Sequence, residues 1–257
     1  MKKIFVLILT SILLTGAIIL LTSDDTTAPS DVAPTANIDI PDEIASTAEA
    51  DIFDKEMFSI NNAESPWVVV NKRRSIPTDY VPASLIVPNV PLRLSSSEEQ
   101  MKISDAAQDA VEELFTASDQ IGLELQFGSG YRSSTLQSQF YNSYSTASGS
   151  AEADRFSARP GHSEHQTGLG LDFTRIDGEC HLQECFSDTA EGIWLSENAQ
   201  RYGFLLRYPR DMESITGYIF EPWHYRYVGV ELAEEIYSSN FSTLEQFFGL
   251  DPAPDYR

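Results

Sequence analysis

The first 60 residues limit where this chain can form a folded domain. Residues 1–22 begin with Lys2 and Lys3 and continue as an apolar stretch whose length suits either an export signal or a short membrane anchor. Residues 23–60 are rich in Thr, Ala, Pro and acidic residues, and Lys55 is their only basic residue. Such a segment buries too little apolar surface to offset its conformational entropy, so it predicts a disordered acidic tether. One folded domain is therefore expected over residues 61–250, followed by a tail at 251–257.

The N-terminal segment also predicts where the domain works. Two lysines before an apolar stretch favour a cytoplasmic N-terminus, with the rest of the chain outside the cytoplasmic membrane. This holds whether the segment is a cleaved signal peptide or an uncleaved anchor. We expect an extracytoplasmic protein of the periplasm or cell envelope, secreted or membrane-anchored, that touches the membrane only through this segment and is a monomer.

The composition excludes two classes of partner. The chain has 17 Lys and Arg residues against 39 Asp and Glu residues, which gives a formal net charge of −22 at pH 7. Nucleic acid and anionic lipid both need a cationic face that displaces counterions, so we expect the domain to bind neither. Hydrophobic residues make up 42% of the chain, which supports a globular core and excludes disorder of the whole chain.

The apolar pattern predicts an α+β domain with a small, mostly antiparallel sheet flanked by helices, because helices and strands do not alternate regularly. Helical spacing and capping signals predict helices at residues 97–121, 135–147, 188–202, 230–237 and 243–248. Alternating or short apolar runs predict strands at residues 67–71, 123–127, 168–173, 204–208, 215–220 and 224–228.

The two cysteines, Cys180 and Cys185, lie five positions apart and flank His181. In an oxidising compartment such a pair most often forms a local disulfide, which is the pairing we expect. Zinc binding by both thiolates and His181 is the alternative, but the spacing matches no common zinc knuckle and oxidation competes for the thiols. His181 itself is expected to be exposed.

Three of the four histidines stand beside carboxylates in two short segments, PGHSEHQTGLGLD and FEPWH. A catalytic zinc ion takes three His or Asp/Glu ligands and leaves one position for water, and His165, Asp172 and His224 can supply that set. Glu221 precedes His224 by three residues. It can therefore act as the base that takes a proton from the water without being a ligand.

Two alternatives remain open from these residues alone. A single histidine is more often a hydrogen-bonded polar side chain than a ligand, and only the joint placement of the residues argues against that interpretation. Two histidines and one carboxylate also bind iron in non-haem oxygenases, although an extracytoplasmic domain with no evident cosubstrate makes this the weaker prediction. His162 is left out of the ligand set, which is complete without it.

Four motifs occur together in this chain: SGYRS at 129–133, Gln137, SARPGHSEHQTGLGLD at 157–172 and ITGYIFEPWHYRYVG at 215–229. Together they resemble the VanY-like D-alanyl-D-alanine carboxypeptidases, which belong to the zinc peptidases that include lysostaphin-type enzymes and the hedgehog signalling domain. The resemblance covers residues 67–248. It implies the fold of that group and one Zn²⁺ per chain.

The resemblance also implies roles for individual residues. His165, Asp172 and His224 match the zinc ligands of the family, and Glu221 matches its base. Arg132 matches an arginine that contacts the substrate carboxylate or the developing oxyanion, a role that suits a guanidinium because it binds a carboxylate through two hydrogen bonds.

Four further residues are predicted around the substrate. Gln137 and Ser163 match positions that line the pocket of relatives acting on cell-wall stem peptides. Tyr131 and Trp223 lie beside these motifs and are expected to form pocket walls, although aromatic residues next to a turn more often pack in the core.

The activity implied by the resemblance is the zinc-dependent removal of terminal D-alanine from peptidoglycan stem peptides. The family cleaves DD-bonds and LD-bonds, so both remain open. The alternatives are a non-catalytic, zinc-dependent cell-wall-binding module and a peptidoglycan endopeptidase. Glu221 argues against a pure binding module, and Arg132, as a carboxylate anchor, argues against an endopeptidase.

Overall fold

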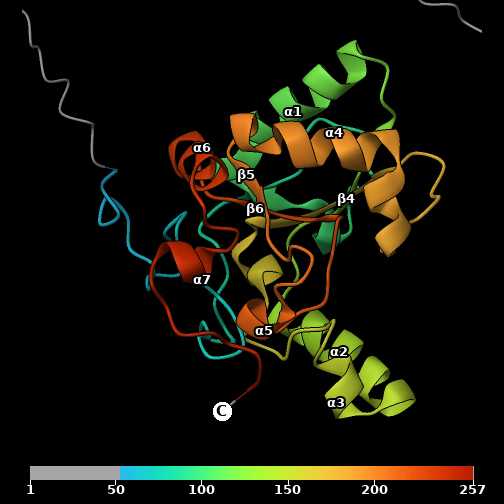
Figure 1. Ribbon diagram of the computed structural model, residues 1–257. Helices are drawn as coiled ribbons and strands as arrows, with labels where there is room; N and C mark the ends of the chain where they lie inside the picture. Colours follow the sequence, from blue (N-terminus) through green and yellow to red (C-terminus); the bar gives the residue numbers. More distant parts are fainter. Residues whose placement is uncertain (1–52, 257) are drawn as a thin grey trace, which may run out of the picture. The chain divides into compact units, whose positions relative to one another are not determined.

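A four-stranded antiparallel sheet lies at the centre of the fold (Figure 1). The computed structural model describes residues 53–256, all within one compact unit, and the predicted N-terminal signal or anchor and most of the tether lie outside them. The strand order is β3-β4-β6-β5, and a second small sheet pairs β1 with β2. The prediction of an α+β domain with a small antiparallel sheet is confirmed.

The strands and helices have the following bounds. The strands are β1 (Leu85–Ile86), β2 (Ile103–Ser104), β3 (Leu125–Ser129), β4 (Gly170–Arg175), β5 (Phe204–Leu206) and β6 (His224–Tyr227). The α-helices are α1 (Gln108–Gln120), α2 (Ser134–Ser148), α3 (Ser150–Ala153), α4 (Ala190–Asn198), α5 (Glu213–Thr216), α6 (Val230–Ser238) and α7 (Leu244–Phe247). The 3₁₀ turns are η1 (Glu99–Met101), η2 (Asp105–Ala107), η3 (Glu164–Thr167), η4 (Glu184–Asp188) and η5 (Ala199–Tyr202).

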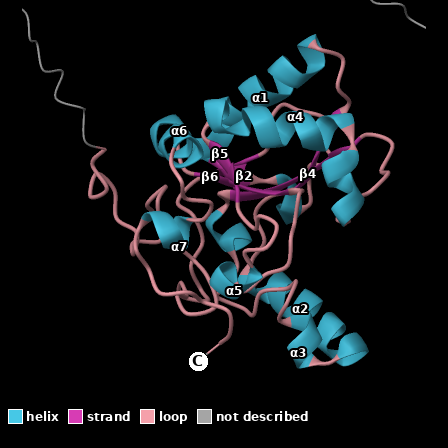
Figure 2. Ribbon diagram, viewed as in Figure 1, coloured by secondary structure: helices cyan, strands magenta, loops and turns pink. Residues whose placement is uncertain are grey.

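Side-chain alternation along β4 separates an apolar face of the sheet from a polar one. Leu171 and Phe173 are fully buried in the main core, where Phe173 packs against Phe115 of α1. Figure 2 shows α1 and α4 on one side of the sheet, with α2, α3 and α5 on the other. Because successive strand residues point to opposite faces, Asp172 points away from this core. It is paired in register with His224 of β6, so polar side chains gather on the second face.

Most of the predicted elements are confirmed, with shifts of a few residues at their ends. The predicted strands at 123–127, 168–173, 204–208 and 224–228 correspond to β3, β4, β5 and β6, and the predicted helices at 135–147, 230–237 and 243–248 to α2, α6 and α7. The helix predicted at 188–202 is α4 followed by η5. It ends at Gly203, whose φ of 81° is the left-handed conformation of a glycine cap.

The helix predicted to begin near residue 97 begins at Gln108 instead. Residues 99–107 form η1, β2 and η2, because their backbone groups bond to distant segments rather than to the next turn. The amide of Tyr131 donates to the carbonyl of Lys102 at 2.6 Å, and the amide of Ser104 donates to the carbonyl of Gly168 at 2.9 Å. Tertiary hydrogen bonds here outweigh the helical spacing.

Two predicted strands are wrong. Residues 215–220 contain the end of α5 and irregular backbone, and residues 67–71 form no strand of the described sheets. The segment 67–71 is nevertheless buried, because arginine side chains rather than a neighbouring strand satisfy its carbonyls. Arg226 donates to Val68 O at 2.8 Å, and Arg74 donates to Val69 O at 3.1 Å.

Residues on both sides of the range 61–250 also pack into this unit. Phe53 stacks on Trp67 with 5.5 Å between the ring centroids, and Ala253 is fully buried. Within residues 53–256, no helix has the length and apolar character needed to cross a membrane.

Candidate active site

A cavity of about 660 Å³ lies on the polar face of the central sheet. It brings together residues that the sequence placed in four separate motifs. The predicted site residues among its walls are Arg132, Gln137, Ser163, His165, Asp172, Glu221, Trp223 and His224. Tyr131 is the one predicted site residue that does not line it.

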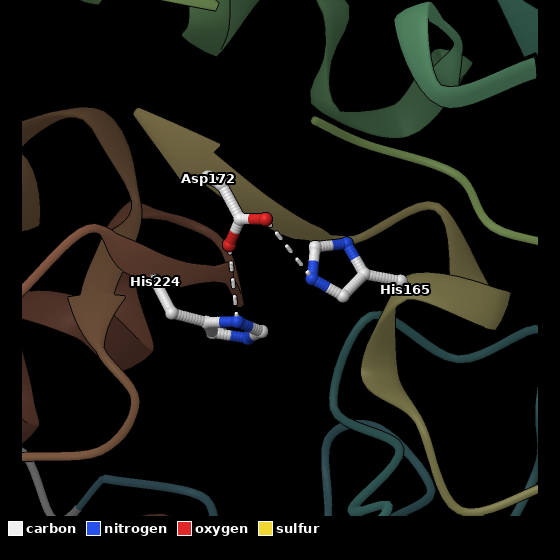
Figure 3. A group of neighbouring side chains, drawn as sticks. All are labelled: His165, Asp172 and His224. Carbon is white, nitrogen blue, oxygen red and sulfur yellow. Dashed lines mark ion pairs between the residues drawn. The ribbon is translucent and has the colours of Figure 1, made fainter. Parts of the chain in front are cut away.

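Three possible metal ligands converge in this cavity from three different elements. His165 lies on η3, Asp172 on β4 and His224 at the start of β6, and all three are buried. Figure 3 shows the carboxylate of Asp172 between the two imidazole rings. Asp172 Oδ2 lies 3.4 Å from His165 Nε2, and Asp172 Oδ1 lies 3.3 Å from His224 Nδ1. The ligand atoms all lie within 4.8 Å of one another.

Backbone contacts orient His165. Its Nδ1 lies 2.7 Å from the carbonyl oxygen of Gly130, so the Nδ1 proton is donated to that carbonyl and Nε2 keeps its lone pair for a metal. Position 130 requires glycine because the backbone packs closely against residue 102: a Cβ there would lie 2.3 Å from the carbonyl oxygen of Lys102. The SGYRS motif therefore helps to set the direction of a ligand that lies 35 residues away.

His224 is oriented by Glu164, a residue for which the sequence motifs predicted no role. His224 Nε2 lies 3.6 Å from Glu164 Oε2, which leaves Nδ1 as the nitrogen that faces Asp172. The other oxygen of Glu164 accepts hydrogen bonds from Arg207 Nε at 2.8 Å and from Arg226 Nη1 at 2.9 Å. Carboxylates in this position fix the ring of a metal-binding histidine and increase its basicity.

The ionic network behind Glu164 is fully buried. The side chains of Glu164, Arg207, Arg226 and Glu245 are all shielded from solvent, and Arg207 also donates to both oxygens of Glu245. Buried charges require such partners, because an unpaired charge in the interior is strongly unfavourable. Glu164 stands in the SEH motif, but its arginine partners are 43 and 62 residues away, so no local spacing could have indicated them.

The donor set fits a metal ion. Asp172 Oδ1 is buried and has no hydrogen-bond partner among residues 53–256. Burying such a carboxylate oxygen is unfavourable unless a cation or a donor compensates it. Two imidazoles and one carboxylate form a typical ligand set of catalytic zinc.

The electrostatics of the site also favour a cation. Burial raises the pKa of Asp172, but His165 and His224 outweigh burial and hold it below its usual range. Burial lowers the pKa of His224, but its contacts with Asp172 and Glu164 raise it overall to about 9. Without a metal, His224 therefore carries a proton at neutral pH, and this proton and the metal compete for the same place.

Glu221 lies beside this group. Its Oε2 is 3.6 Å from His224 Nδ1, and its backbone amide donates to Tyr208 O, which fixes the turn before β6. Burial raises the pKa of Glu221 to about 8; Asp172 adds to the rise, while His224 and Arg132 oppose it. A buried carboxylate whose pKa lies near neutrality can both accept and return a proton.

Arg132 is held at the edge of the same cavity. Its Nη1 donates to Gln137 Oε1 at 2.9 Å, its Nη2 donates to Ser129 Oγ at 3.3 Å, and Nη2 lies 3.9 Å from Asp172 Oδ2. Gln137 is in turn fixed by a hydrogen bond from its Nε2 to Ala158 O. Ser163 is buried at the N-terminus of η3 and lines the cavity.

The prediction that Tyr131 forms a pocket wall is wrong. Tyr131 is 5% exposed, and its pKa is raised by burial and by nearby Glu99. The backbone amide of Tyr131 donates to Lys102 O while that of Arg132 donates to His165 O, and it is Arg132 that lines the cavity. Trp223, by contrast, lines the cavity and also packs against the main core.

The two remaining histidines, His162 and His181, lie outside the ligand set. His162 Nδ1 donates to Asn71 O at 2.8 Å, and His162 lies outside the ligand group, as expected. The predicted disulfide between Cys180 and Cys185 is present, with an S–S distance of 2.08 Å. His181, inside this loop, was expected to be exposed; it is instead half-buried, lines the cavity and lies 3.2 Å from Thr174 Oγ1.

Comparison with known proteins gives matches over most of this unit. The family model "VanY: D-alanyl-D-alanine carboxypeptidase" matches residues 100–230. A D-alanyl-D-alanine carboxypeptidase of Enterococcus faecalis (strain ATCC 700802 / V583) is 34% identical over 201 residues, which are 73% of this chain and 68% of the relative.

Solved structures resemble the chain as well. The LdcB LD-carboxypeptidase, whose structure is solved, shares 38% sequence identity with this chain and superposes with a TM-score of 0.69. The match covers 73% of this chain and 87% of that one. The zinc complex of a mutant of the vancomycin resistance D,D-pentapeptidase VanY is 34% identical, with a TM-score of 0.57, over 70% of this chain and 97% of that one. A zinc-bound structure among these neighbours favours zinc over iron for the cluster of His165, Asp172 and His224.

Proposed function

This chain belongs to the VanY family of D-alanyl-D-alanine carboxypeptidases, and from that premise we propose that it is a zinc carboxypeptidase that removes the terminal D-alanine of peptidoglycan stem peptides. The observation that carries the proposal is the convergence of three metal ligands, a buried carboxylate and an arginine in one cavity. The proposal includes both bond types, since relatives are named for each: a D,D-pentapeptidase and an LD-carboxypeptidase.

In the proposed mechanism His165, Asp172 and His224 hold the zinc ion. When bound, zinc acts as a Lewis acid that polarises the scissile carbonyl and lowers the pKa of water. Glu221 takes the proton of the attacking water at its carboxylate and then passes it to the nitrogen of the leaving D-alanine. Glu164 holds the ring of His224 in place through this cycle.

Arg132 is proposed to bind the free carboxylate at the end of the peptide. Its guanidinium is fixed by Gln137 and Ser129, so little side-chain freedom is lost when substrate binds. A guanidinium binds a carboxylate through two charge-assisted hydrogen bonds. Recognition of a free carboxylate would make the enzyme an exopeptidase and not an endopeptidase.

The proposed place of action is the cell envelope. Peptidoglycan lies outside the cytoplasmic membrane, and the N-terminal sequence, with two lysines before an apolar stretch, supports export through a signal peptide or an anchor. We propose that the acidic residues 23–52 are a tether between this segment and a monomeric carboxypeptidase domain, since Phe53 already packs against Trp67. The membrane would then be reached only through residues 1–22.

Digestion of purified muropeptides by the zinc-loaded protein, with products identified by mass spectrometry, tests the proposal. We expect the loss of one alanine from a pentapeptide, a tetrapeptide or both, and no loss after zinc is removed with a chelator. Release of no alanine from either substrate would contradict the carboxypeptidase proposal. Zinc-dependent binding without cleavage would indicate a wall-binding module, and cleavage of cross-links would indicate an endopeptidase.

A further inference from the structure

The cavity continues beyond the metal ligands along β4, towards Arg93 and the disulfide loop. Thr174 lies two residues after Asp172 on the same face of the strand, about 7 Å further along. His181 of the loop contacts Thr174 there, and both Arg93 and His181 line the cavity. This end of the cavity has no role in the mechanism described above.

Arg93 is fixed in place and yet has no acidic partner. Its backbone amide donates to Phe127 O at 3.0 Å, and its side-chain Nε donates to Gly128 O at 2.9 Å, so it lies along the outer edge of β3. It forms no ion pair with any residue in the part of the chain that the structure describes. In a chain with a net charge of −22, a half-buried guanidinium beside a cavity and without a carboxylate partner is free to bind an anion from outside.

His181 is held beside Arg93 by an unusual backbone. Cys180 and Leu182, the residues on either side of it, have φ values of 57° and 50°, in the left-handed region that residues other than glycine seldom adopt. Such conformations persist where surrounding structure enforces them, and they cluster at ligand sites. Here the disulfide to Cys185 closes the loop. Nδ1 of His181 faces Thr174, and Nε2 has no hydrogen-bond partner among the described residues.

We propose that Arg93 and His181 form a second anion subsite, which binds a carboxylate of the stem peptide upstream of the scissile bond. The inference rests on the proposed function, in which Arg132 takes the terminal carboxylate. Arg93 donates to Gly128 O and Arg132 donates to Ser129 Oγ, so the two guanidiniums lie at neighbouring positions of β3, and Arg93 can take a second carboxylate of the peptide whose terminal carboxylate Arg132 binds. Stem peptides offer two carboxylates of this kind, on the γ-linked D-glutamate and on the side chain of diaminopimelate, and in some cell walls the first is amidated.

The chemistry gives the subsite a measurable preference. A charge-assisted hydrogen bond to a guanidinium contributes enough to favour a carboxylate over its neutral amide by about 10- to 100-fold. His181 would add a hydrogen bond and would exclude water from the pair. If the subsite takes the D-glutamate carboxylate, it should distinguish unamidated from amidated peptides. If it takes the diaminopimelate carboxylate, it should distinguish diaminopimelate from lysine.

The test uses four synthetic peptides that combine D-glutamate or its α-amide with diaminopimelate or lysine. Binding is measured by calorimetry with the zinc-loaded E221Q protein, so that the readout needs no hydrolysis. We expect one of the two upstream carboxylates to strengthen binding about 10- to 100-fold over the peptide in which that carboxylate is replaced by its neutral counterpart. The added substitution R93Q should abolish this preference, while the affinity for the peptide that lacks both upstream carboxylates (the neutral peptide) is unchanged. The matched control is R201Q, since Arg201 is exposed, lies on η5 and likewise has no acidic partner among residues 53–256.

Equal affinity for carboxylate and neutral peptides, or a preference that survives in R93Q, overturns the subsite. If R93Q does not fold, H181Q is measured in the same way, and the comparison of peptides on the protein with Arg93 intact still decides the proposal. Failure of the proposed function is seen separately, as the absence of released alanine when the protein with Glu221 intact is incubated with the same peptides.

Discussion

The two ends of the cavity differ in how their side chains are held. At the metal end, His165, Asp172 and His224 are no more than 5% exposed, and the ionic network of Glu164 lies behind them. At the other end, Arg93 and His181 are half-buried and depend on a sheet edge and a disulfide-closed loop. The groups proposed for bond cleavage thus lie on the central sheet or on buried turns packed against it, where their positions are fixed, while Arg93 and His181 lie on more exposed segments that tolerate sequence change.

Removing the base is expected to have the largest effect at the metal end. In E221Q the amide cannot take a proton, so kcat should fall about 100- to 10,000-fold. Bound zinc, measured by atomic emission, should stay at one per chain, because Glu221 is outside the ligand set. E213Q is the control, since Glu213 pairs with Arg155 at an exposed position. Hydrolysis by E221Q at the wild-type rate would remove Glu221 from the mechanism.

Substitution of the buried Glu164 tests whether a buried charge contributes more to the free energy of unfolding than an exposed one. In E164Q, Arg207 and Arg226 lose the anion that both contact, so the free energy of unfolding should fall by about 3–5 kcal/mol. Zinc affinity should fall about 10- to 100-fold, because His224 loses its carboxylate partner. The control E152Q breaks an exposed pair with Arg155 and should cost at most about 1 kcal/mol. Denaturant unfolding measures the free energy of unfolding, and zinc titration measures the zinc affinity. Equal losses of stability in E164Q and E152Q would contradict the proposed role of the buried network.

The stability of the metal-free protein should decrease as the pH rises from 6 to 9. The folded protein raises the pKa of His224 from 6.5 to about 9, so the stabilisation that its proton provides is complete below pH 6.5 and is lost as the pH rises to about 9. The pKa of Glu221 rises from 4.5 to about 8, so its ionisation destabilises the fold over an overlapping range. Zinc competes with protons at this site, and the increase in Tm that it produces should grow over the same interval. Thermal scans with chelator and with zinc check this, and a metal-free Tm that rises with pH would refute it.

The smallest effect is expected at the recognition end. The double substitution C180S/C185S opens the loop that holds His181, so the preference for a carboxylate peptide should decrease by less than about 10-fold, short of the loss expected on removing Arg93. Zinc content and the hydrolysis of the neutral peptide should not change, since neither cysteine lines the cavity. Peptide kinetics measure the ratio. A loss of zinc in this variant would show that the two ends of the cavity are not independent.

Local motifs were enough to predict the ligands. His165 and Asp172 are seven residues apart, and a 3₁₀ turn followed by a strand brings them together, as the pattern of the segment suggested. The direction of Tyr131 and the burial of His181 were not predictable in this way. The direction of Tyr131 and the burial of His181 depend on which side of a neighbouring segment faces the cavity. The spacing of residues within a motif does not predict this.

The α+β class and the disulfide were predictable from the sequence, and so was the convergence of His165, Asp172 and His224, because short motifs carry these residues. The side chains that support them could be identified only in the folded chain. The bonds from Arg207 and Arg226 to Glu164 cross 43 and 62 residues, and the start of α1 was set by hydrogen bonds to Gly168 and Tyr131. Buried polar groups form hydrogen bonds with the partners that lie close to them in the packed chain, and the whole fold rather than the local sequence sets which partners these are.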